Sequence, residues 1–287
     1  MGLEAFAVLT KRQEDLLRKS FCYTTPALVT LSSMSGAVLF KARASQRVEG
    51  TAVAKASLQY KKDKVTFTPK RKSDGTSAYV LEYAHNGDFK LKSECKVTRT
   101  LVEKAYETTI SAEYSQPQYR AKVAIVEPGL AVKGSATVGS ENLGVAVDWK
   151  FDVAAQRLVG YGFAHYWLDK QCKVVLKHVG TDRTKFALGD FSLSYFQETS
   201  AKSSVAAIVK YNHPKSETFI EFGGSHSLTS DTELRGKVDS TGLLAGSFSR
   251  LFNDNVKLTL ASQVDVKKVV QTSTSDFKFG VRLDLNA

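Results

Sequence analysis

Apolar and polar side chains alternate with a period of two through almost the whole chain after Tyr23. In the C-terminal stretch DFKFGVRLDLNA, Phe277, Phe279 and Val281 fall on one face, and polar residues such as Lys278 fall on the other. This period is that of a strand with one apolar and one polar face. The same pattern runs through AVLFKARAS, FKLKSECKV, AYETTISAEY, QYRAKVAIV, GVAVDWKF and NVKLTLASQVDV. The sequence therefore predicts an all-β protein.

The alternating segments are separated by turn signals such as Asn86-Gly87-Asp88 and Asn253-Asp254-Asn255. About 19 segments of about ten residues fit between Tyr23 and Ala287. Sandwich strands average only about 5–6 residues, whereas tilted strands that cross a membrane need about 9–11. A soluble barrel of about eight strands would leave more than half of the chain unused. Because no linker divides the chain, we expect an N-terminal segment, residues 1–22, and one β-barrel, residues 23–287.

Only one segment has a helical pattern. Gly2–Lys19 is rich in helix formers, and its apolar residues between Phe6 and Leu17 recur at roughly helical spacing. The segment is amphipathic and can dock on another surface. Acids such as Glu14 and Asp15 argue against an import presequence, because presequences are poor in acids.

The polar faces of the predicted strands carry too many charges for a dry core. An unpaired charge in an apolar interior costs several kcal/mol or more, and pairing seldom offsets that cost fully. A single hairpin of this kind would favour a soluble sheet with one solvated face. Across so many segments, however, there are no partner helices to cover the apolar faces. A closed barrel with lipid outside and water inside resolves both problems. Aromatic residues expected to form girdles at its rims are Tyr79, Tyr83, Tyr106, Tyr114, Tyr119, Trp149 and Trp167.

The formal net charge is +11, from 40 Lys and Arg against 29 Asp and Glu. These basic residues are spread singly along the chain, which suits a lumen better than a polybasic arm. Acids on the same predicted face are Glu82, Glu94, Glu107, Glu113, Asp148, Asp265 and Asp284. The basic residues expected to line the lumen are Lys41, Arg43, Lys90, Lys92, Lys96, Arg120, Lys122, Lys133, Lys150, Lys173, Lys177, Lys257, Lys278 and Arg282. Because aromatic and basic residues lie on opposite faces, binding of nucleic acid is not expected.

Catalysis, cofactors and metal ions find no support in the sequence. The three cysteines, Cys22, Cys95 and Cys172, have no C-x-x-C spacing and are odd in number, so neither a disulfide framework nor a zinc site is indicated. The histidines are dispersed, and there is no phosphate-binding loop. No run of about 18–20 apolar residues predicts a transmembrane helix, and no secretory signal is recognisable.

The chain ends on a pattern of polar, Gly and two hydrophobic residues, provided by Lys278, Gly280, Leu283 and Leu285. Together with the N-terminal amphipathic helix and the alternating segments, it resembles the mitochondrial voltage-dependent anion channel family, the eukaryotic porins. The stretches Lys64–Thr76 and Leu234–Asp265 also look like the family's fourth strand and late hairpins. The resemblance implies a barrel of 19 strands, which is the number adopted for the segments above.

This resemblance implies a voltage-gated, weakly anion-selective pore of the mitochondrial outer membrane that passes small anions and metabolites such as ATP and ADP. The N-terminal helix would lie in the lumen, its movement would contribute to gating, and its cations Lys11, Arg12, Arg18 and Lys19 would add to the positive field. The terminal pattern would be read by the sorting machinery of that membrane. Expected partners are outer-membrane lipid, small anions and nucleotides in transit, and further copies of the chain or a larger membrane complex.

Two departures from the family pattern bear on this expectation. Pro69 stands where many members have a membrane-facing acid, and because proline lacks a ladder donor the fourth strand should be bulged or frayed there. The family's Gly-Leu-Lys tripeptide, linked with nucleotide binding, is absent, which leaves a discrete nucleotide site in doubt. An alternative is the protein-import pore of the same membrane, but its path is acid-lined and its N-terminal extension is longer.

Overall fold

The computed structural model describes residues 3–23, 25, 27–46, 52–99, 104–140, 142–180, 189–272 and 277–286. Within these ranges the chain forms 19 strands and three short helical segments. The helical segments are the 3-10 helix η1 (Phe6–Val8), α1 (Lys11–Arg18) and α2 (Val266–Thr272). The first ten strands are β1 (Ala27–Ser35), β2 (Val38–Gln46), β3 (Ala52–Lys62), β4 (Val65–Lys72), β5 (Ser77–Ala84), β6 (Phe89–Arg99), β7 (Lys104–Ser115), β8 (Tyr119–Glu127), β9 (Ala131–Gly139) and β10 (Leu143–Asp152). The others are β11 (Arg157–Leu168), β12 (Cys172–Gly180), β13 (Asp190–Ser200), β14 (Ser203–Asn212), β15 (Glu217–Ser227), β16 (Thr232–Asp239), β17 (Leu243–Asn253), β18 (Val256–Asp265) and β19 (Phe277–Asn286).

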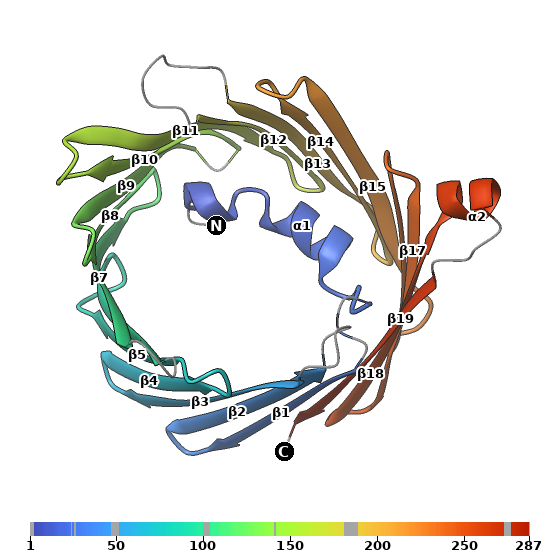
Figure 1. Cartoon of the computed structure of the whole chain (residues 1–287), viewed down its shortest axis with the longest axis horizontal. Coiled ribbons are helices and arrows are strands. Elements are labelled where there is room, and N and C mark those ends of the chain that lie inside the picture. The colour runs from blue at the N-terminus through green and yellow to red at the C-terminus, as the bar shows by residue number, and fades with distance from the viewer. Residues whose placement is uncertain are drawn as a thin grey trace.

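The strands form one closed ring (Figure 1). Each strand pairs antiparallel with the next along the chain, and the ring closes between β1 and β19, where Ala27–Ser32 runs parallel to Val281–Asn286. In a meander with an odd number of strands the first and last point the same way, so this closure can only be parallel. Closure leaves no unpaired sheet edge, as hydrocarbon requires. The predicted barrel of 19 strands is confirmed.

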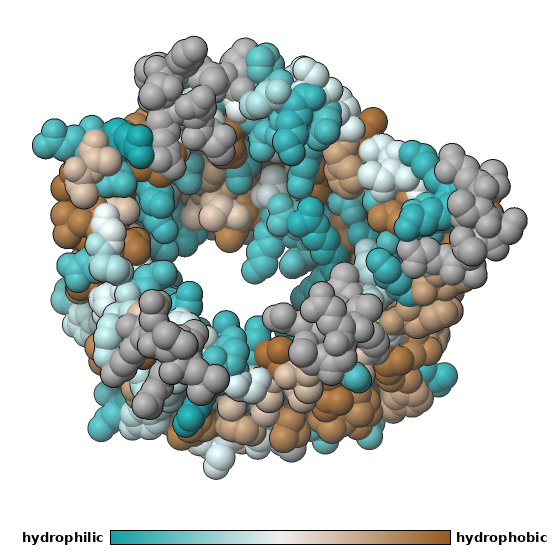
Figure 2. Space-filling model, viewed as in Figure 1, coloured by the Kyte–Doolittle hydropathy of each residue, from teal (hydrophilic) through white to brown (hydrophobic). Residues whose placement is uncertain are grey.

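Hydrophobic residues gather on the outside of the ring, most clearly at the lower right of Figure 2, and hydrophilic residues border much of the central opening. Outward side chains such as Phe279 and Ile110 are 66% and 57% exposed, as suits contact with acyl chains. Strands of 8–12 residues, tilted by about 45°, span roughly the 25 Å of a barrel's apolar band. The seven tyrosines and tryptophans predicted for the girdles all lie on this exposed outer face. Among the described residues, no helix has the length and apolar character needed to cross a membrane.

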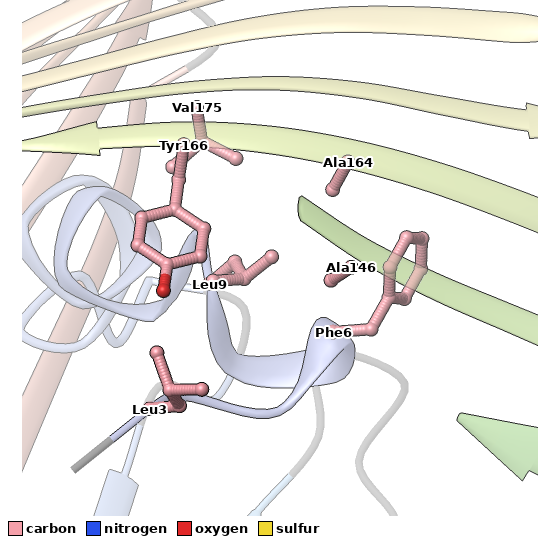
Figure 3. Close-up of a cluster of buried hydrophobic side chains, with 7 residues drawn as sticks. All are labelled: Leu3, Phe6, Leu9, Ala146, Ala164, Tyr166 and Val175. Carbon is pink, nitrogen blue, oxygen red and sulfur yellow. The ribbon is translucent and has the colours of Figure 1, made fainter. Parts of the chain in front are cut away.

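The N-terminal segment lies inside the ring, along the wall formed by β9 to β15 (Figure 1). Leu3, Phe6 and Leu9 pack against Ala146, Ala164, Tyr166 and Val175 of that wall (Figure 3). Leu16 and Leu17 pack against Phe196, Ala206 and Ile208. This placement agrees with the predicted helix in the lumen, and it occurs because this part of the inner wall is apolar.

The predicted continuous helix over Gly2–Lys19 is wrong in extent. Gly2 lies outside the described residues, and the segment breaks into η1 and α1 around Leu9. The short 3-10 helix η1 and the extended backbone at Ala5 before it let Leu3, Phe6 and Leu9 reach the wall together. Packing against the barrel therefore overrides the local preference for one α-helix.

The expectation of a single helical segment is also wrong, because α2 connects β18 to β19. The carboxylate of Asp265 accepts a hydrogen bond from the backbone N–H of Lys268 at 3.1 Å, which caps the start of that helix. The expected disturbance at Pro69 is present as a gap. The β3–β4 ladder pairs Ser57 with Lys70 and resumes at Tyr60 without a change of register.

Candidate functional site: the lumen wall

Contacts with the N-terminal segment identify the inner face of each strand. The guanidinium of Arg120 donates a hydrogen bond to the carbonyl of Leu3 at 3.2 Å, and that of Arg235 donates one to the carbonyl of Asp15 at 3.1 Å. Directly paired residues on neighbouring strands point to the same side of a sheet. The observed registers therefore extend the assignment of the inner face from these contacts around the whole ring.

All fourteen barrel cations singled out in the sequence occupy inner-face positions. They are Lys41, Arg43, Lys90, Lys92, Lys96, Arg120, Lys122, Lys133, Lys150, Lys173, Lys177, Lys257, Lys278 and Arg282. The structure brings Lys92, Arg120, Lys122, Lys133 and Lys150 together around one cavity of about 630 Å³ beside η1. On the helix, Lys11, Arg18 and Lys19 are exposed and Arg12 is half-buried.

Several of these cations are held by partners. Lys173 is almost fully buried and forms an ion pair with Glu4, and Arg120 pairs with Glu113. Lys92 Nζ lies 3.0 Å from Glu82, and Arg282 Nε lies 2.8 Å from Asp284. A paired cation contributes little to the long-range field, so these residues attract mobile anions less than an unpaired lysine does.

The N-terminal segment is also held by a cation that sequence reasoning missed. Lys237 lies over the ring of Phe21 at 4.9 Å and pairs with Glu221 at 2.9 Å. Further inner-face cations that were missed are Lys55, Lys61, Lys70, Lys72, Lys210 and Arg235. The signal for those on β3 was present, because Lys55 and Lys61 stand on the polar side of a regular alternation.

Charge is distributed unevenly around the wall. On β5 to β8, cations and acids face each other across the ladder, as Lys90 faces Glu113 and Lys96 faces Glu107. In contrast, β1 to β4 contain no Asp or Glu at all. This part of the wall lies across the lumen from α1 (Figure 1).

The linker from helix to barrel passes directly over the terminal strand. A Cβ at Gly280 would lie 2.3 Å from the carbonyl oxygen of Cys22 and 2.8 Å from the backbone nitrogen of Tyr23. Only glycine admits so close an approach of another backbone. Cys22 is buried there, and this burial raises the pKa of its thiol. Of the other residues in the terminal pattern, Lys278 faces the lumen and Leu283 and Leu285 face outward.

Ligand chemistry of other kinds is not built into the part of the chain that the structure describes. No group of three or more His, Cys, Asp or Glu residues there could hold a metal ion. The ring of His178 instead lies tilted against that of Phe191, with ring centroids 4.6 Å apart, on the outer face.

Residues 4–280 match the family model described as eukaryotic porin. The non-selective voltage-gated ion channel VDAC2 of Xenopus laevis is 23% identical over 296 aligned positions, covering 99% of each chain. Mitochondrial outer membrane protein porin 5 of Oryza sativa subsp. japonica is 24% identical over 288 positions, covering 99% of this chain and 98% of its own. Among solved structures, a triple mutant of the Rhodopseudomonas blastica porin superimposes with a TM-score of 0.50 at 9% identity, over 80% of this chain and 90% of that porin. At that identity the likeness concerns the fold alone.

Proposed function

The chain belongs to the eukaryotic porin family and is a barrel pore protein of the mitochondrial outer membrane, and we propose that it is a voltage-gated, weakly anion-selective diffusion pore. Its cargo would be small anions and metabolites such as ATP and ADP. In this proposal the chain is a conduit rather than an enzyme.

The observation that carries this proposal is a closed ring that is apolar outside and lined by an excess of cations inside. Fixed positive charge raises the local concentration of anions in a water-filled lumen and lowers that of cations. The preference is weak because many of the cations are paired and because salt screens the rest beyond about 8 Å at physiological ionic strength. Weak binding suits a conduit, since a solute that is bound tightly does not leave.

The proposal assigns the fourteen barrel cations described above to the wall of the conduction path. Lys11, Arg12, Arg18 and Lys19 add positive charge on the helix, whose movement in the transmembrane field contributes to gating. Residues 1–22 act as one unit inside the barrel of residues 23–287. Lys278, Gly280, Leu283 and Leu285 serve as the sorting signal.

The test is the reversal potential of refolded protein in planar bilayers across a KCl gradient, with voltage ramps. We expect a large conductance, a modest preference for chloride and a fall in conductance at high voltage of either sign. A cation preference with block by a basic presequence peptide would instead favour the import pore, and a failure to insert would contradict a pore function altogether.

A further inference from the structure

Five cations form a lattice on the inner face of β2, β3 and β4. Arg43 on β2 is paired directly with Lys55 on β3, and Lys55 is paired with Lys72 on β4. One step further along the strands, Lys41 and Lys70 flank Ser57. Side chains in direct register have Cβ atoms about 4.5–5.5 Å apart, so three cations stand side by side in one row. We call these five residues the β2–β4 lattice.

The lattice has no carboxylate of its own. Strands β1 to β4 contain none, and among the described residues no lattice cation lies within ion-pair distance of one. The nearest acid in sequence is Asp74, in the β4–β5 turn. Its carboxylate accepts a hydrogen bond from the backbone N–H of Thr76 at 2.9 Å, and this bond keeps the pKa of Asp74 low. Lys72 and Lys55 also contribute to that lowering, but Asp74 belongs to the turn between β4 and β5 and not to the inner face of a strand.

Like charges directly opposite each other destabilise a sheet, so such a row needs a reason. Strands β6 to β8, a little further around the ring, show the ordinary solution, in which Glu113 stands between Lys90 and Lys122 across the ladder. Lys133 and Lys150, which are also proposed to line the lumen, form another pair of cations in direct register. Asp148 lies beside them on the same face. Departures from local rules tend to mark functional sites in proteins.

We propose that the β2–β4 lattice is a docking site for the polyphosphate chain of nucleotides in transit. Neighbouring strands lie about 4.8 Å apart, so the row from Arg43 to Lys72 spans about 10 Å, enough to follow three linked phosphates. Arg43 offers a planar fork to phosphate oxygens, and the lysines offer point charges. The lattice cations are exposed or half-buried and stay hydrated, so phosphate binds to them weakly and dissociates rapidly. The proposal rests on the anion-pore function above and locates one of its steps.

The site recognises phosphate and not the base. Inner-face residues next to the lattice, such as Thr30, Ser45 and Gln59, include no aromatic ring on which a base could stack. Inorganic tripolyphosphate and ATP should therefore bind alike, and AMP should bind less well because it carries fewer charges.

The test compares two variants that each lose two lumen charges, K55Q/K72Q within the lattice and K133Q/K150Q as the matched control. Each is inserted in planar bilayers, and the excess current noise and loss of KCl conductance are measured as tripolyphosphate, ATP or AMP is added. We expect K55Q/K72Q to raise the half-saturating tripolyphosphate concentration roughly tenfold, which corresponds to about 1.4 kcal/mol, and we expect a change under about threefold in the control. The charge-conserving variant K55R/K72R should restore the response.

An equal rise of the half-saturating tripolyphosphate concentration in the two glutamine variants would refute the proposed site, because it would show only a diffuse positive field. An anion-selective wild-type channel that shows no noise with tripolyphosphate would overturn it as well. A wild-type channel without chloride preference in the KCl gradient would instead contradict the proposed function, so the two failures are distinguishable. Formation of stable open channels in KCl shows that each variant has folded and inserted.

Discussion

Replacing Gly280 by alanine should release the N-terminal segment from its place in the lumen. The added Cβ would lie 2.3 Å from the carbonyl oxygen of Cys22 and 2.5 Å from its carbonyl carbon. Both are backbone atoms that cannot rotate away, and comfortable contacts are about 3.5 Å or more. The linker must therefore move by roughly 1 Å or the strand must yield. Overpacking of this kind costs about 1–3 kcal/mol.

A cost of that size lowers the ratio of docked to released linker by a factor of about 5–150. The reporter is the alkylation rate of Cys22 by a polar maleimide, in a background where Cys95 and Cys172 are replaced by serine. The reacting species is the thiolate. Because burial raises the pKa of the Cys22 thiol, docking keeps this residue unreactive at neutral pH. The docked state is favoured below the pKa of the free thiol, about 8.5, and weakens as the pH rises above it.

The expected result is faster labelling of Cys22 in G280A by a factor within that range. The matched control is G236A, because a Cβ at Gly236 meets no atom within 4 Å. Refolding from denatured protein avoids any effect on sorting, so the experiment isolates the contact in the folded barrel. Labelling of G280A at the wild-type rate would show that Gly280 does not hold the linker.

Three other measurements follow from the same contacts. E4Q leaves the buried ammonium of Lys173 without its counter-charge, at a cost of about 1–2 kcal/mol, so the N-terminal segment should be cleaved by protease about tenfold faster. E14Q should change little, because Glu14 bonds within the segment. A disulfide between L17C and A206C, which replace neighbours in one buried cluster, should abolish closure at high voltage until it is reduced; unchanged closure would show that the helix does not move in gating. Raising KCl from 0.1 to 1 M shortens the screening length from about 10 to about 3 Å and should reduce the chloride preference, and a preference independent of salt would refute its electrostatic origin.

The alternation of side chains was sufficient to predict the strands and their two faces. In the terminal strand, Phe279 and Val281 face outward and Lys278 and Arg282 face the lumen, as their period requires. The reason is physical: lipid and water meet at the barrel wall, so each face admits only one kind of side chain.

The docking surface for the helix was not predicted, although it left a trace in the sequence. Val175, Phe196 and Ile208 occupy lumen positions where the alternation predicts polar residues. Apolar residues on the inner face mark the wall that another apolar surface covers. From one strand at a time they look like irregularities, and only the closed ring shows that they face the same N-terminal segment.

Registers and long-range contacts set the limit of what a single sequence can predict. The period assigns Arg43 and Lys55 to the inner face, but only the β2–β3 register makes them direct neighbours, and a shift by two residues would keep the same faces and disperse the lattice. Likewise, Gly280 belongs to a terminal pattern that resembles a sorting signal, and nothing near it in the sequence indicates that Cys22 crosses above it. Closing the ring brings the first and last strands of the barrel together, so the same glycine lies in that pattern and beneath the linker to the helix. A loss of activity in a Gly280 variant therefore has two separate causes to distinguish, and only a measurement on the refolded barrel separates them.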